Sequence, residues 1–331
     1  MERTEVPNCT IPLRLGCINR IFSNDYVSIA RPDHWFKNIF VIPGIVFSWM
    51  AVPPQHIDQA IVSIAWTLIA VCLVCSANYT INELLDAPED RKHPVKRFRP
   101  AACGRIKTHF AYLQWFILGA SGLVITYVID LHLLIANATL LVMGLIYNVR
   151  PFRSKDLPYL DVLSESVNNP LRFLLGWYAF GSTVVPPVSL ILAYWMLGAF
   201  FMAIKRFAEI RQIKDIQVLA SYRKSFSHYT SERLLISILV YSSAFAFFSG
   251  IFIIRYHVEL VLLVPLYSLF MGIYLRLGFK ENSPVQNPES LYKNKMLVLF
   301  CIVVLLATVG CLSIYMPFMH RLFETTIPNG F

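Results

Sequence analysis

Nine long apolar stretches alternate with shorter polar stretches along the chain. A helix of about 20 mostly apolar residues is long enough to cross a bilayer, so each stretch is a candidate membrane span. The seventh and eighth stretches are separated only by Arg255, Tyr256 and His257, which predicts a tight hairpin. The pattern therefore predicts an all-α, polytopic membrane protein with nine transmembrane helices, at residues 36–53, 59–83, 110–129, 132–148, 157–180, 188–208, 234–254, 258–275 and 296–316.

Basic residues gather in every second loop. Of the 29 Lys and Arg residues, all but Arg172, Arg255 and Arg321 lie near the first span's start or around the loops that follow even-numbered spans. Lys and Arg accumulate in cytosolic loops, so the N-terminus is predicted to be cytosolic and the C-terminus to lie on the opposite side. The net charge of +9 is thus explained by membrane topology, which argues against a nucleic-acid partner.

The composition agrees with a membrane protein, because 56% of the residues are hydrophobic and only 15% are charged. Soluble domains carry about a quarter charged residues. No polar segment is large enough to form a domain of its own. We expect a cytosolic or interfacial segment at residues 1–35, in which residues 10–30 lie flat on the membrane, a transmembrane domain at 36–320, and a short tail at 321–331.

Three oxygen-bearing side chains recur every four residues at the end of the second predicted span. Asn82, Asp86 and Asp90 would lie on one face of a helix. Pro88 disfavours helical geometry, so we expect the helix to end near Asp86 and Asp90 to fold back from the loop. Carboxylate and amide oxygens suit Mg²⁺, whose remaining positions are filled by water and substrate phosphates. An ordinary acidic loop at the membrane surface is the alternative interpretation.

A basic run, residues 91–100, follows this acidic motif directly. It is typical of a cytosolic loop. Its position next to a candidate metal site also suggests that Lys96, Arg97 and Arg99 grip phosphate oxygens, because a metal-bound diphosphate needs further cationic partners.

The fifth predicted span carries Asp161, Glu165, Asn168 and Arg172 on one helical face. Charged groups at membrane depth are costly and usually face a wet cavity or the interior of the bundle. The pattern favours a polar cavity wall. An ion pair between Glu165 and Arg172 that fixes helix packing is the alternative.

Lys205, Arg206 and Glu209 lie at the cytosolic end of the sixth predicted span, and Tyr222 and Arg223 follow in the next loop. The basic residues among them are candidates for binding phosphate. A solvated helix end and a surface loop are the alternatives.

These features, in this order, resemble the UbiA superfamily of intramembrane prenyltransferases. The likeness begins at residues 31–38, continues through Asn82, Asp86 and Asp90, which are similar to the family's NDxxDxxxD motif, and includes Tyr147 before the fifth span. It covers nearly the whole chain. The resemblance implies a UbiA-like bundle of nine helices with a cytosol-facing active site, Mg²⁺ as the cofactor, and a place in a bacterial inner membrane.

Within that superfamily the chain is most similar to the polyprenyl-phosphate phosphoribosyltransferases, in residues 93–100, in residues 205–209 and in the loop containing Tyr222 and Arg223. This resemblance implies transfer of 5-phosphoribose from phosphoribosyl diphosphate to a polyprenyl phosphate. The implied metal ligands are Asn82, Asp86 and Asp90, with Glu83 as a further candidate. The implied substrate-binding residues are Lys37, His93, Lys96, Arg97, Arg99, Tyr147, Asp161, Glu165, Arg172, Lys205, Arg206, Glu209, Tyr222 and Arg223.

The chain departs from the family pattern at two points. Glu83 stands where the first motif normally has Asp. Lys205, Arg206 and Glu209 stand where aromatic prenyltransferases have a second Asp-rich motif. Phosphoribosyl diphosphate and a lipid phosphate bring more negative charge than a prenyl diphosphate with a neutral acceptor, so added cations favour the former pair. An aromatic prenyltransferase using a polyprenyl diphosphate is the first alternative, and a non-enzymatic lipid transporter is the second.

Overall fold

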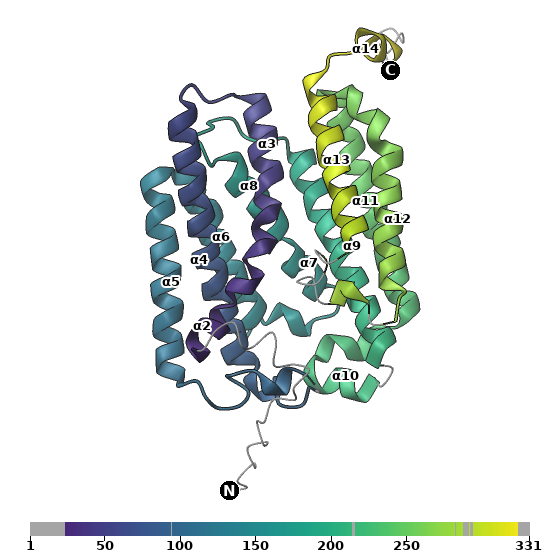
Figure 1. The fold of residues 1–331 in the computed structure, drawn as a ribbon. Helices are drawn as coiled ribbons and strands as arrows, with labels where there is room; N and C mark the ends of the chain where they lie inside the picture. The colour runs from purple at the N-terminus through teal and green to yellow at the C-terminus, as the bar shows by residue number, and fades with distance from the viewer. Residues whose placement is uncertain are drawn as a thin grey trace, which may run out of the picture.

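The computed structural model describes residues 24–93, 95–213, 216–281, 283–286, 291 and 294–323, so most of the predicted segment 1–35 and of the tail 321–331 lies outside the described residues. Within these ranges every regular element is a helix, and α2 and α14 lie at opposite ends of one bundle (Figure 1). The elements are α2 (Asp25–Ala30), η1 (Pro32–Val41), α3 (Ile42–Ala51), α4 (Ile57–Asp90), η2 (Lys96–Phe98), α5 (Thr108–Ile129), α6 (Leu131–Asn148), η3 (Ser154–Asp156), α7 (Leu160–Ser166), α8 (Asn168–Trp177), α9 (Val188–Ile213), α10 (Ile216–Tyr222), η4 (Lys224–His228), α11 (Ser231–Tyr256), η5 (Val258–Leu263), α12 (Val264–Gly278), η6 (Pro284–Gln286), α13 (Lys295–Ser313) and α14 (Pro317–Phe323).

Seven helices in the described ranges are long and apolar enough to cross a membrane. They are α4, α5, α6, α9, α11, α13 and the continuous stretch formed by η5 and α12. These seven coincide with the second to fourth and sixth to ninth predicted spans. The all-helical membrane architecture is therefore confirmed. The predicted number of nine spans is not confirmed, because the first and fifth predicted spans are each divided into two shorter elements.

Prolines accompany both divisions. In the first predicted span, α3 begins at Ile42 and has Pro43 in its first turn. In the fifth, α7 ends at Ser166 and α8 begins at Asn168, shortly before Pro170. Proline lacks an amide hydrogen, which leaves a carbonyl of the preceding turn without its helical donor. Irregular backbone inside a membrane is tolerated only where it is covered by protein or faces water. At the second division Trp195 of α9 lies against the break: its indole N–H donates to the carbonyl of Leu163 at 3.0 Å and to the Ser166 hydroxyl at 3.1 Å.

The two divided spans cross each other through a pair of glycines. A β-carbon built on Gly44 of α3 would lie 2.0 Å from the carbonyl oxygen of Phe173, and one built on Gly176 of α8 would lie 2.1 Å from the carbonyl oxygen of Val41. Real β-carbons do not approach other atoms so closely. The helices can therefore meet backbone to backbone only because both positions are glycine.

Replacing either glycine with alanine is expected to destabilise the protein. Gly44→Ala must force the two backbones apart, and overpacking of this kind costs about 1–3 kcal/mol. Gly250 of α11 provides a matched control, because a β-carbon there would meet nothing within 4 Å. Gly250→Ala should be neutral or stabilising, since alanine favours a helix. Thermal unfolding of the purified variants in detergent measures both effects, and an unchanged midpoint for Gly44→Ala would contradict the crossing.

Helix α4 is longer than predicted. It continues through Pro88 and ends at Asp90, so the predictions that it ends near Asp86 and that Asp90 folds back from the loop were wrong. Pro88 lies in the last turn, where its missing amide costs only one helical hydrogen bond, the one to Leu84. The next amide, that of Arg91, donates to the carbonyl of Ala87 at 3.2 Å, which completes the turn. The whole acidic row therefore stands on one continuous helix.

Candidate active site

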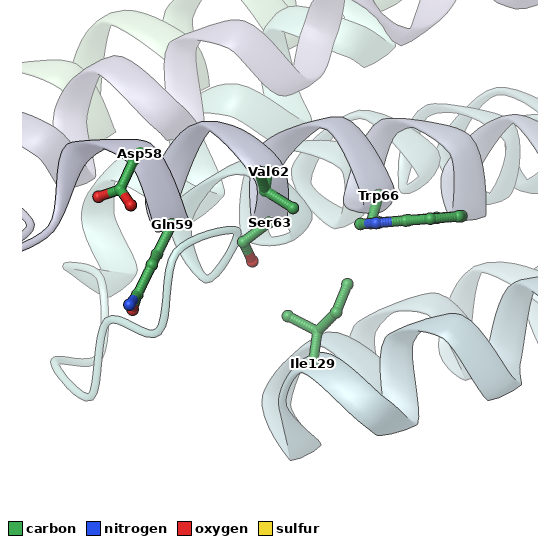
Figure 2. A pocket seen from close by; sticks show the side chains of 6 residues that line it. All are labelled: Asp58, Gln59, Val62, Ser63, Trp66 and Ile129. Carbon is green, nitrogen blue, oxygen red and sulfur yellow. The ribbon is translucent and has the colours of Figure 1, made fainter.

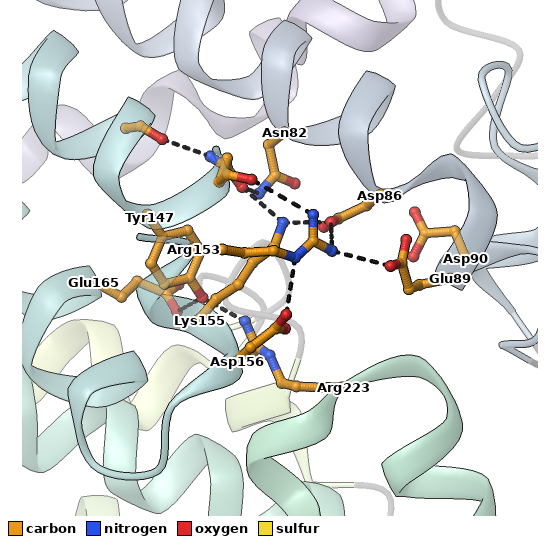
Figure 3. Close-up of polar contacts among 12 residues, drawn as sticks. Asn82, Asp86, Glu89, Asp90, Tyr147, Arg153, Lys155, Asp156, Glu165 and Arg223 are labelled. Atoms are coloured by element: carbon orange, nitrogen blue, oxygen red, sulfur yellow. Dashed lines mark hydrogen bonds and ion pairs between the residues drawn. The ribbon is translucent and has the colours of Figure 1, made fainter. Parts of the chain in front are cut away.

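Charged side chains from separate segments meet at the end of the bundle where α4 and α9 end. Acids of α4 face basic residues of the η3 loop (Figure 3). A second group of acids surrounds Arg206 of α9. Side-chain burial is high, so the electrostatic interactions are screened less than at an open surface. This arrangement forms one polar site with two parts.

In the first part, basic side chains hold the predicted metal-binding carboxylates. The Lys155 ammonium donates to Asp86 Oδ1, and Arg153 Nη2 donates to the same oxygen at 3.2 Å. Arg153 also lies 3.3 Å from Glu89 Oε1, so it bridges two acids of α4. Asp90 Oδ2 accepts a hydrogen bond of 2.6 Å from Arg99. The acidic row is thus neutralised by residues from two different loops.

Asn82 belongs to the same network. Its amide donates to Asn148 Oδ1 at 2.6 Å, and Lys155 donates to that oxygen at 2.8 Å (Figure 3). Among the described residues, Asn82 Oδ1, Asp86 Oδ2 and Asp90 Oδ1 accept no hydrogen bond.

The residues present fit a Mg²⁺ ion that shares its ligands with a substrate. No group of three or more His, Cys, Asp or Glu side chains in the described ranges could hold a metal ion by itself. Mg²⁺ needs only one or two protein carboxylates when phosphate oxygens and water complete its octahedron. Asn82, Asp86 and Asp90 each have an oxygen available for that purpose, on one helix face. Glu83 follows Asn82 directly, so it lies about 100° around the helix from this face, and its Oε2 forms an ion pair of 2.8 Å with Arg31.

In the second part, one guanidinium binds three carboxylates. Arg206 Nε lies 3.1 Å from Asp161 Oδ2, and its Nη2 lies 2.8 Å from Glu165 Oε2. Its Nη1 lies 3.5 Å from Glu209 Oε2. Arg206 is only 3% exposed. These acids are therefore occupied by an internal cation and do not form a second metal site.

Asp161 has further partners besides Arg206. Its carboxylate also accepts hydrogen bonds from the Tyr229 hydroxyl and, at 3.3 Å, from the Ser225 hydroxyl. It is completely buried. These contacts anchor η4 and the start of α11 to α7, and a contact of Asp161 with substrate stays a prediction.

Glu165 remains partly open to the site, with 30% of its side chain exposed. The Tyr147 hydroxyl donates to Glu165 Oε2 at 2.8 Å, and Arg223 Nη2 donates to Tyr147 (Figure 3). Tyr147, Glu165 and Arg223 therefore come together as the sequence suggested. The side chain of Tyr222 lies outside the described part of the chain.

Arg172 does not join this group. Its Nε donates to Asn38 Oδ1 at 3.0 Å and its Nη2 donates to Cys75 Sγ at 3.3 Å. The alternative interpretation, an ion pair between Glu165 and Arg172, was wrong, because the break at Val167 interrupts the helical face that would align them. Arg172 instead joins η1, α4 and α8 inside the bundle.

The loop after α4 contributes unequally to the site. Burial lowers the pKa of His93 to about 3, so its neutral ring accepts from the amides of Val95 and Lys96, at 3.0 and 3.1 Å, and shapes the loop. Burial also lowers the pKa of Lys96 to about 8, although Glu209 acts in the opposite direction. Arg97 is exposed and stacks on Phe98, 4.8 Å from the ring centroid. Lys96 and Arg99 thus lie within the charged cluster, whereas Arg97 is exposed, and its role in substrate binding stays a prediction.

Lys37 and Lys205 approach the site from η1 and α9. Lys37 Nζ lies 3.2 Å from His34 Nδ1 and 5.6 Å from the ring centroid of Tyr79. Lys205 interacts electrostatically with Glu165, Lys37, Arg206 and Glu209. It has no hydrogen bond or ion pair within the part of the chain that the structure describes, unlike its neighbour Arg206.

Sequence reasoning missed Arg153 and Lys155, which had been counted only as loop charges. Burial lowers the pKa of Lys155, and the neighbouring Asp86 acts against this effect. The only signal in the sequence was their position a few residues after Tyr147 and Asn148, at the end of α6. In the fold, the loop after α6 places both side chains against Asp86 of α4. The course of a loop cannot be predicted from residue spacing.

A separate hollow lies at the opposite end of α4, far from the acidic row. It is shallow and apolar, has a volume of about 410 Å³, and contains none of the predicted site residues (Figure 2). Its lining residues are Asp58, Gln59, Val62, Ser63, Trp66 and Ile129.

Comparisons with known proteins agree with this architecture. The profile of the UbiA prenyltransferase family matches residues 40–300. A decaprenyl-phosphate phosphoribosyltransferase from Mycolicibacterium smegmatis is 31% identical over 211 residues, 63% of this chain and 63% of that protein. The protein of the same name from Corynebacterium glutamicum is 30% identical over 210 residues, 62% of this chain and 59% of that protein. These matches span less than two thirds of either relative.

A solved structure of a UbiA homolog from Archaeoglobus fulgidus, bound to GPP and Mg²⁺, is similar in fold. The TM-score is 0.65 at 20% sequence identity, and the likeness covers 88% of this chain and 100% of that one. At this level of identity the likeness concerns the fold alone.

Proposed function

Because the chain belongs to the UbiA prenyltransferase family, a family of transferases, we propose that it transfers 5-phosphoribose from phosphoribosyl diphosphate to a polyprenyl phosphate. The observation that carries this proposal is the ion cluster around Arg206. Its guanidinium occupies Asp161, Glu165 and Glu209, the acids that could otherwise hold a second metal. A site whose first part can bind a metal ion and whose second part contains a buried guanidinium suits two substrates that both carry phosphate. The named relatives from mycobacteria and corynebacteria support the same assignment.

In this proposal Asn82, Asp86 and Asp90 hold Mg²⁺, which would neutralise charge on the leaving diphosphate. Lys155 and Arg153, which bind Asp86 in the structure, exchange that partner for phosphate oxygens of the donor. Arg223 and Glu165 flank the donor from the other side. An oxygen of the lipid phosphate attacks the anomeric carbon, and the bond from that carbon to the diphosphate breaks with its electron pair leaving on diphosphate. The acceptor is already ionised at neutral pH, so the step needs no strong general base.

We also propose that the protein is integral to a bacterial inner membrane and that its site faces the cytosol, where the soluble donor is available. The clustering of Lys and Arg at the polar end of the bundle supports this orientation.

The proposal is tested with membranes that contain the protein, Mg²⁺, ribose-labelled phosphoribosyl diphosphate and a polyprenyl phosphate. Label should move into the lipid phase, and chelation of Mg²⁺ should stop the transfer. A parallel reaction supplies a polyprenyl diphosphate with hydroxybenzoate. Prenylated product in that reaction, without label in the lipid, would support the aromatic prenyltransferase instead. Lipid movement without either product would indicate a transporter.

A further inference from the structure

Two ammonium groups, those of Lys37 on η1 and Lys205 on α9, interact electrostatically in the bundle. On η1, Lys37 faces inward and lies over the Tyr79 ring of α4, with its ammonium 5.6 Å from the ring centroid. Neighbouring side chains of the same element are apolar and exposed. Trp35, Phe36 and Ile39 are 41%, 39% and 60% exposed. One short element thus presents a cation to the site and an apolar surface to its surroundings.

Lys205 of α9 lies within electrostatic range of Lys37. Lys205 interacts electrostatically with two acids, Glu165 and Glu209. Both of these acids form ion pairs with Arg206. Within the described residues Lys205 makes no ion pair or hydrogen bond. A partly buried ammonium without a counter-ion, placed beside a second ammonium, is unfavourable until an anion binds.

Resting on the function proposed above, we propose that Lys37 and Lys205 bind the phosphate monoester of the lipid acceptor, whose chain leaves along the exposed apolar side of η1. The donor also carries a phosphate monoester, at C5 of its ribose, so the chemistry of the subsite fits both substrates. The position of Lys37 on η1 favours the lipid acceptor over the donor as the ligand of this subsite. Arg153, Lys155 and Arg223 lie beside Asp86 and Glu165 and serve the donor, whereas Lys37 lies on the element with the exposed apolar side chains.

Binding to the purified protein in detergent tests this subsite without requiring turnover. The probes are a short polyprenyl monophosphate, the corresponding polyprenol, and phosphoribosyl diphosphate with Mg²⁺. Lys205→Met and Lys37→Met should each weaken binding of the monophosphate about tenfold or more, because a charge-assisted hydrogen bond is lost. Polyprenol and donor binding should stay unchanged. Lys205→Arg should restore part of the affinity.

Lys280→Met is the matched control, since Lys280 is exposed at the end of α12 and outside the site. If Lys205→Met weakens donor binding instead, the subsite belongs to the 5-phosphate and the inference is overturned. Unchanged binding of all three probes would also overturn it. Failure of the proposed function looks different: the wild-type protein would transfer no label, whatever the lysine variants bind. In an active preparation, both lysine variants should raise KM for the lipid and leave KM for the donor unchanged.

Discussion

Replacing Arg206 with Met is expected to leave little stably folded protein. The substitution removes the partner of Asp161, Glu165 and Glu209 together, and Asp161 is completely buried. Breaking one buried ion pair costs about 3–5 kcal/mol, because the remaining charge stays uncompensated. Whole domains are stable by only about 5–15 kcal/mol. The loss should therefore appear as aggregation or as a large fall in the unfolding midpoint.

The matched control for this experiment is Lys205→Met, one residue away on α9. Lys205 has no ion pair among the described contacts, so its removal should change thermal unfolding little. The two variants are expressed under the same conditions, and their size-exclusion profiles and unfolding midpoints are compared in detergent. Equal midpoints for Arg206→Met and Lys205→Met would show that the three carboxylates do not depend on Arg206.

Replacing Asp86 with Asn is expected to abolish most of the transfer activity while the protein stays folded. The amide keeps the shape of the side chain but loses the charge that would hold a divalent ion and that pairs with Lys155 and Arg153. Electrostatic stabilisation of a leaving diphosphate is worth several kcal/mol, so turnover should fall about 100-fold or more. The label-transfer assay under saturating Mg²⁺ measures this loss.

Asp58→Asn serves as the control for Asp86→Asn. It makes the same chemical change on the same helix, at the exposed opposite end of α4. Its activity and its unfolding midpoint should match those of the wild type. If Asp86→Asn retains full turnover, the metal-binding role of the acidic row is wrong, even if the reaction itself is confirmed.

The apolar pattern predicted the fold class because membrane spans need only length and hydrophobicity. It located all seven long helices, although α4 and α9 continue beyond their predicted ends. It failed to divide the first and fifth spans, because the divisions depend on tertiary partners. The break after Ser166 is stabilised by Trp195, and the crossing at Gly44 requires Gly176 on another helix. No local pattern contains those partners.

Spacing was a good guide to the site wherever the residues share one regular helix. Asn82, Asp86 and Asp90 lie on the same side of α4 as their four-residue interval predicted. Spacing failed for Arg172, because a helix break separates it from Glu165. The choice of partner was also unpredictable. Arg206 looked like a phosphate ligand, yet its guanidinium is already bound to three acids.

Because α4 continues without a break through Pro88 to Asp90, it should tolerate substitutions better than insertions or deletions. Its acidic row meets partners on two separate loops, through Arg99 and Lys155. A single residue inserted or deleted in α4 before Asn82 would rotate the rest of the helix by about 100° and shift it by about 1.5 Å. Every acid would then face away from its partners at once. We therefore expect related proteins to exchange residues along α4 but to keep a constant number of residues between its membrane-embedded half and Asp90, while the surrounding loops vary in length.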